Sequence, residues 1–260
     1  MNYRTDVVMK DGKLTVAEHE KGADTAYPLP KVEATDLLVS DQWGESWKKE
    51  AGDHGHDKAL EFLGDAQAAI SRTFKAYGEI REQRSPEVTQ ATHLNNVARD
   101  FDRALKGLAD RSDRAQAQAQ ARLESIESEF RESVKWSEQD AGELRAVLRG
   151  MSDSERQELI GNAIESGDGQ VLAAVLGAHP TLSGMNADLH KATRARAMQK
   201  HRPDLYKLEQ TISKAKQATR DAFTDLLDKS DALTARDVRA KYQKAAEEAA
   251  EVRRKAAELY

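Results

Sequence analysis

The C-terminal quarter of the chain decides the fold. Residues 205–226 read LYKLEQTISKAKQATRDAFTDL, and residues 238–259 read VRAKYQKAAEEAAEVRRKAAEL. Apolar or small residues recur there at alternating steps of three and four, which aligns them along one face of a helix. The two stripes are Leu205, Leu208, Ile212, Ala215, Thr219, Ala222 and Leu226, then Val238, Tyr242, Ala245, Ala249, Val252, Ala256 and Leu259. We predict an antiparallel αα-hairpin, in which Thr234 caps the start of the second helix, with covering helices from the same chain or from another.

Long helical patterns also fill residues 57–136, where apolar residues recur at helical spacing. Ser85-Pro86 interrupts them, and we expect Ser85 to cap the next helix with Pro86 at its first position. Residues 115–121 alternate Ala and Gln, but both residue types favour helix, so we predict an unbroken helix to residue 136.

Shorter helices are expected between residues 137 and 202. Ser152 and Glu155 have the spacing of a capping box, in which each side chain accepts from the other's backbone amide. Gly167-Asp168-Gly169 ends that helix and begins another. The amides at this second start would either bind an anion or simply begin the helix.

The first fifty residues differ from the rest. Asp11-Gly12 lies between β-forming residues and predicts a hairpin. A hairpin alone is marginal in water, so we expect its apolar residues to contact the body or another chain. These are Val7, Val8, Leu14 and Val16. Trp43 and Trp47, four residues apart, form an apolar anchor for either the chain's own core or a neighbouring subunit.

The predicted fold is therefore mainly α: an elongated helical bundle or coiled coil with a small N-terminal β-hairpin arm. We divide it into four segments along the chain. They are residues 1–56 (arm and linker), 57–136 (long helical hairpin), 137–202 (short helices with a basic helix) and 203–260 (αα-hairpin).

Composition limits the chemistry. The chain has 260 residues, of which 33% are charged, a net charge of -5 and no cysteine, so disulfides and thiolate nucleophiles are excluded. No apolar run approaches the roughly 18 to 20 residues of a membrane span, and we expect no membrane contact. Residues 1–6 lack the apolar core of a signal peptide, so we expect no export by that route.

One short stretch is dense in potential metal ligands. Asp53, His54, His56 and Asp57 lie within five residues, which suits either a zinc site or a polar loop that caps a helix. The sequence contains no phosphate-binding loop, dinucleotide fingerprint or nucleophile elbow. We therefore expect no resident metal, no cofactor and no enzymatic activity.

A basic cluster lies between Asp188 and Asp204, with no acidic residue inside it. Such a cluster can contact nucleic-acid phosphates, bind an acidic protein surface, or remain a solvated face. Its members are Lys191, Arg194, Arg196, Lys200 and Arg202.

The stretch from Ser152 to Met185, SDSERQELIGNAIESGDGQVLAAVLGAHPTLSGM, with the helical run to Leu208, resembles virion and assembly proteins of tailed bacteriophages. The resemblance implies a capsid, connector or tail accessory, in the virion or the host cytoplasm, and transfers no catalytic residue. We therefore predict a non-enzymatic structural or assembly protein with protein partners, including further copies of itself. The alternatives are an internal scaffolding protein or a nucleic-acid-binding module that uses residues 190–202.

Overall fold

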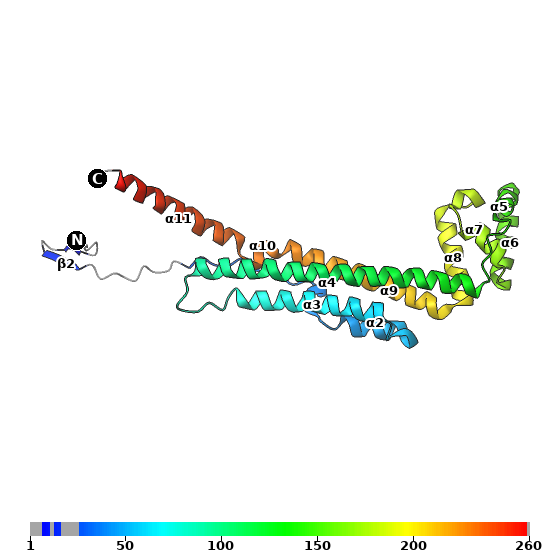
Figure 1. Ribbon diagram of the computed structural model, residues 1–260, viewed down its shortest axis with the longest axis horizontal. Helices are drawn as coiled ribbons and strands as arrows, with labels where there is room; N and C mark the ends of the chain where they lie inside the picture. The colour runs from blue at the N-terminus through cyan, green and yellow to red at the C-terminus, as the bar shows by residue number, and fades with distance from the viewer. Residues whose placement is uncertain (1–6, 11–12, 17–25, 259–260) are drawn as a thin grey trace. The chain divides into compact units, whose positions relative to one another are not determined.

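The computed structural model describes residues 7–10, 13–16 and 26–258, and this part of the chain is mainly α-helical (Figure 1). The strands are β1 (Val7–Lys10) and β2 (Lys13–Val16), and the short 3-10 turns are η1 (Gly52–His54) and η2 (Pro180–Ser183). The helices are α1 (Asp36–Val39), α2 (Trp43–Ala51), α3 (Lys58–Ile80), α4 (Gln90–Ser133), α5 (Ala141–Gly150), α6 (Asp153–Ser166), α7 (Gly169–Leu176), α8 (Ala187–His201), α9 (Pro203–Asp228), α10 (Ser230–Leu233) and α11 (Arg236–Ala257).

The two strands pair antiparallel, with Val7 opposite Val16 and Lys10 opposite Lys13. The Asp11-Gly12 turn between them lies outside the described residues, as do the side chains of both strands. The hairpin arm, as a unit that contacts partners, therefore stays a prediction.

The chain forms two compact units. Unit 1 contains residues 1–33, 74–105 and 227–260, and unit 2 contains residues 34–73 and 106–226. These units do not follow the four predicted segments, because α3 and α4 each begin in one unit and end in the other. In particular, most of α9 belongs to unit 2, whereas α11 belongs to unit 1.

The core of unit 2 contains the predicted stripe of α9. Each of its seven side chains, from Leu205 to Leu226, is fully buried, which confirms the heptad prediction for this helix. Small residues of α4, Ala115 and Ala119, are buried in the same core. Gln116 Nε2 donates to the carbonyl oxygen of Lys216 at 3.0 Å, which places these helices in direct contact.

Two glycines allow α2 and α3 of unit 2 to approach closely. A Cβ atom on Gly64 would lie only 2.9 Å from the Cα atom of Gly44, a distance that packed side chains do not adopt. Buried polar groups of α3 also bind α1: Gln67 Nε2 donates to Leu37 O at 2.5 Å, and Ser71 Oγ donates to Ser40 O at 2.8 Å.

The predicted capping box of α6 is confirmed. Ser152 Oγ accepts from the amide of Glu155 at 3.4 Å, and Glu155 Oε2 accepts from the amide of Ser152 at 3.0 Å. The helix ends at Gly167, whose φ of 72° is left-handed, as glycine readily allows. Asp168 then accepts from the amides of Gln170 and Val171, so the start of α7 is capped by the chain itself.

A buried arginine organises unit 1. Arg81 is only 4% exposed, and its guanidinium donates to two backbone carbonyls far apart in the sequence, Ala232 O at 2.6 Å and Pro30 O. Burial lowers the pKa of Arg81, although the nearby carboxylate of Glu82 partly opposes this. The segment around Pro30, the end of α3 and helix α10 are therefore joined by one side chain.

An aromatic cluster completes unit 1. The rings of Tyr27 and Tyr242 lie edge to face with centroids 4.9 Å apart, beside buried Leu94 and Val238. Gln90 closes the cluster, because its amide accepts from Tyr27 N at 2.8 Å and donates to Tyr27 O at 2.9 Å.

Two predicted helix starts are wrong. Helix α4 begins at Gln90 rather than Pro86, because Thr89 Oγ1 accepts from the amide of Thr92 at 3.3 Å and so caps the helix there. Helix α11 has Ala235 at its N-cap, with a left-handed φ of 48°, in place of Thr234. The Ala/Gln stretch, by contrast, is helical throughout, as predicted.

We predict that Gly64→Ala destabilises the protein by about 1–3 kcal/mol, because the added methyl group forces α2 and α3 apart. The matched control is Gly107→Ala on α4, where no atom lies within 4 Å of the added Cβ. That change should stabilise by up to about 1 kcal/mol through helix propensity. Urea unfolding of the three proteins measures both effects, and equal stability of the two variants would contradict the close approach.

Candidate protein-interaction surface

The second predicted stripe, on α11, is covered only at its beginning. Val238 is buried and Tyr242 is partly buried, both in the aromatic cluster of unit 1. The next four positions are exposed, and Val252 has 67% of its surface accessible. We call these four the α11 stripe: Ala245, Ala249, Val252 and Ala256.

The exposed part of α11 is supported by contacts within the helix. Lys255 Nζ lies 2.8 Å from Glu251 Oε1, and Gln243 Nε2 donates to Glu247 Oε1 at 3.0 Å. Such i,i+4 pairs stabilise a helix by only about 0.2–0.5 kcal/mol each. Helices in proteins gain most of their stability by packing an apolar face against other elements. The α11 stripe is such a face, and it is exposed in the single chain.

The paired tryptophans do not form such a surface. Trp47 is 4% exposed and belongs to the core of unit 2, and partly buried Trp43 packs against the same core. Their ring centroids are 6.5 Å apart. Of the two alternatives predicted for Trp47, the structure shows packing in the chain's own core, so its indole is not exposed to anchor a neighbouring subunit.

The basic cluster on α8 is largely neutralised within unit 2. Arg194 Nη2 lies 2.8 Å from both Glu127 Oε2 and Glu209 Oε1. Glu165 pairs with Lys200 at 2.6 Å and with Arg196 at 3.4 Å. These acidic partners come from α4, α6 and α9, and no local sequence signal pointed to them.

The two remaining members of the basic cluster, Arg202 and Lys191, differ in whether they form an ion pair. Arg202 pairs at 2.9 Å with Asp204, two residues further along the chain. Lys191 forms no ion pair with an acidic side chain in the described residues. The cluster therefore offers one unpaired cation, which weakens the case for a phosphate-binding face.

The ion pair with Arg194 lowers the pKa of Glu127. Partial burial tends to raise the pKa of Glu127, but hydrogen bonds from Arg194 and Arg131 more than offset this, so its pKa lies below the usual value. The carboxylate is therefore ionised at neutral pH and holds α4 against α8.

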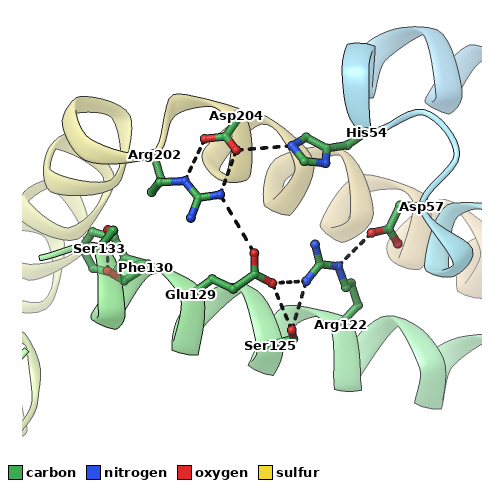
Figure 2. A network of polar contacts seen from close by, with 9 residues as sticks. All are labelled: His54, Asp57, Arg122, Ser125, Glu129, Phe130, Ser133, Arg202 and Asp204. Atoms are coloured by element: carbon green, nitrogen blue, oxygen red, sulfur yellow. Dashed lines mark hydrogen bonds and ion pairs between the residues drawn. The ribbon is translucent and has the colours of Figure 1, made fainter. Parts of the chain in front are cut away.

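The Asp53–Asp57 loop takes part in a chain of alternating charges within unit 2 (Figure 2). Arg122 of α4 binds Asp57 at 2.8 Å and also binds Glu129. At the other end, His54 Nε2 lies 3.4 Å from Asp204 Oδ2. The guanidinium of Arg202 holds the pKa of Asp204 well below its usual range.

This loop caps a helix, as one of the two alternatives predicted. Asp57 Oδ1 accepts from the amide of Ala59 at 2.9 Å at the start of α3. His56 is exposed. Across the part of the chain that the structure describes, no three His, Asp or Glu side chains gather into a group that could hold a metal ion. His54 is instead a member of the charged network.

Two further predictions concern surfaces. The side chains of Val7, Val8, Leu14 and Val16 lie outside the described part of the structure, so their contact with a partner stays a prediction. Within residues 7–10, 13–16 and 26–258, no helix combines the length and apolar character needed to cross a bilayer.

Comparisons with known proteins give no relative for this chain: no protein-family model, curated protein or solved structure matches it significantly. Functional inference therefore depends on the residues themselves, and the α11 stripe is the apolar surface that the fold leaves uncovered on a predicted helix seam.

We predict that Arg194→Ala destabilises the protein by about 1–3 kcal/mol at neutral pH, because it leaves the carboxylates of Glu127 and Glu209 facing each other. Arg196→Ala, on the exposed side of the same helix, should change stability by less than about 0.5 kcal/mol. Thermal unfolding of both variants measures the difference.

Repeating the unfolding measurements at acidic pH tests in which direction the stability deficit of Arg194→Ala changes. Because the folded pKa of Glu127 is lowered, its stabilising contribution is present above its unfolded pKa and is lost as the pH falls through the folded value. The deficit of Arg194→Ala should therefore shrink in acid. A deficit that grows as the pH falls would contradict the ion-pair account.

Proposed function

We propose that this chain is a non-enzymatic structural or assembly protein that acts through protein–protein contacts. The single observation that carries the proposal is the α11 stripe. Its seam residues follow the same heptad pattern as the buried stripe of α9, yet four successive positions are exposed. A helix with this pattern is typical of one that completes its packing against a partner.

The resemblance of residues 152–208 to phage proteins supports a more specific setting. We propose a virion component of a tailed bacteriophage, such as an accessory of the capsid, connector or tail. An internal scaffolding protein would share the charged helical composition and the exposed stripe. It differs in that its self-association would be transient and weakened by salt.

The nucleic-acid alternative has less support. Ion pairs within the chain already engage Arg194, Arg196, Lys200 and Arg202, so phosphate contacts would have to displace these acids. Each displaced pair reduces the counterion release that drives phosphate binding. Contact through the apolar residues of the α11 stripe displaces none of these ion pairs.

We predict that the purified full-length chain, measured by light scattering after size exclusion, has a discrete mass that is a multiple of 28.9 kDa. The mass should be the same at low and high salt, since apolar contacts are not screened. A mass that falls with salt would favour the scaffold. A monomer from about 1 µM to about 1 mM, a range that covers weak association, would contradict assembly with itself.

A further inference from the structure

We propose that the α11 stripe binds the same stripe on a second copy of the chain. The two helices run antiparallel, and Ala249 of each copy faces Val252 of the other. This inference rests on the proposed function and names the partner at its contact surface.

The covered and uncovered parts of the seam are continuous. Val238 and Tyr242 are packed within unit 1, so this face of α11 is already a packing face where the chain can cover it. Ala245 and Ala249 continue the same face, one and two helical turns further on, and are exposed. The partner therefore extends an apolar contact that the chain begins.

Charges on α11 are arranged in two neighbouring blocks. The acidic block is Glu247, Glu248 and Glu251, and the basic block is Arg253, Arg254 and Lys255. When Ala249 of one antiparallel helix faces Val252 of the other, the acidic block of each copy lies beside the basic block of its partner. A sequence that carries both blocks in this order is complementary to itself, which is why a second copy fits the surface.

The positions that flank the stripe specify the same arrangement. In heptad terms Glu248 and Lys255 lie on one flank of the stripe, and an antiparallel pair brings flanks of the same kind together. Glu248 of each copy then lies near Lys255 of the other. Such exposed pairs contribute little affinity, but they set the direction and register of helix pairing.

Other arrangements are less complementary. Shifting the antiparallel pair so that Ala249 faces Ala245 places the two acidic blocks against each other. A parallel pair in register would also bring Glu248 near Arg253, but it holds like blocks at the same height and stacks Val252 on itself. Charge repulsion therefore selects the antiparallel register centred between Ala249 and Val252.

Small side chains make the contact geometrically feasible. Three of the four residues in the α11 stripe are alanine, which lets two helix backbones approach closely. The buried stripe of α9 shows the same use of small residues, since Ala215 and Ala222 are fully buried there. Val252 supplies the one larger apolar side chain, and each copy places it over the alanine of the other.

The test compares two arginine substitutions on neighbouring positions of one helix. Ala249→Arg places an unpaired charge in the centre of the contact. Ala250→Arg adds the same charge one residue away, on a side that faces solvent. Both positions are exposed in the single chain, so neither variant disturbs its fold. Circular dichroism spectra and melting curves of both variants verify this.

Light scattering over a concentration series then measures the dimer. We expect Ala249→Arg to weaken dimerisation at least about tenfold and Ala250→Arg to change it by less than about twofold. Equal effects of the two variants, or an unchanged dimer with Ala249→Arg, would overturn the inference. An oligomer that persists with Ala249→Arg leaves the proposed function intact and rejects only this surface. A wild-type chain that is monomeric throughout rejects both this surface and self-assembly.

Discussion

Burial of the α9 stripe is the constraint on which unit 2 depends. Its seven side chains, from Leu205 to Leu226, are inaccessible to solvent, and the three smallest, Ala215, Thr219 and Ala222, lie together between larger residues. Helices that cover such a stripe must approach closely opposite the small residues, and α4 does so with Ala115 and Ala119. The ion pairs of Arg194 then join α8 to α4 and α9 around this core.

The requirement to bury an apolar helix stripe also underlies the function proposed for α11. Its stripe has the spacing of the α9 stripe, but the chain covers it only as far as Tyr242. Unit 1 is fixed around that first part by Arg81 and by the tyrosine pair, neither of which extends to the second half of α11. The chain therefore buries the α9 stripe in its own core and leaves the α11 stripe exposed to solvent.

Local sequence patterns predicted most of the helices. Helical spacing is a property of one stretch of chain, so α4, α9 and α11 and the capping box at Ser152 could be read directly. The start of α4 could not, because Ser85 and Thr89 are both competent caps and only the folded segment distinguishes them. Left-handed Ala235 similarly has no signal in the sequence.

Predictions that depended on distant residues were less successful. The acids that neutralise α8 come from positions as far away as Glu127, and no spacing rule links them to Arg194. The burial of Trp47 depends in the same way on helices from elsewhere in unit 2. Sequence also gave no means of deciding which of the two heptad stripes the chain would cover, and that difference is the basis of the proposed function.

The most direct measurement is disulfide cross-linking between two single-cysteine variants. The chain has no cysteine of its own, so Ala245→Cys and Ala256→Cys each introduce one reporter. In the antiparallel register, residue 245 of one copy faces residue 256 of the other. The account predicts covalent dimers when the two variants are mixed and oxidised, and none from either variant by itself. Cross-links within each single variant, or none in the mixture, would contradict it.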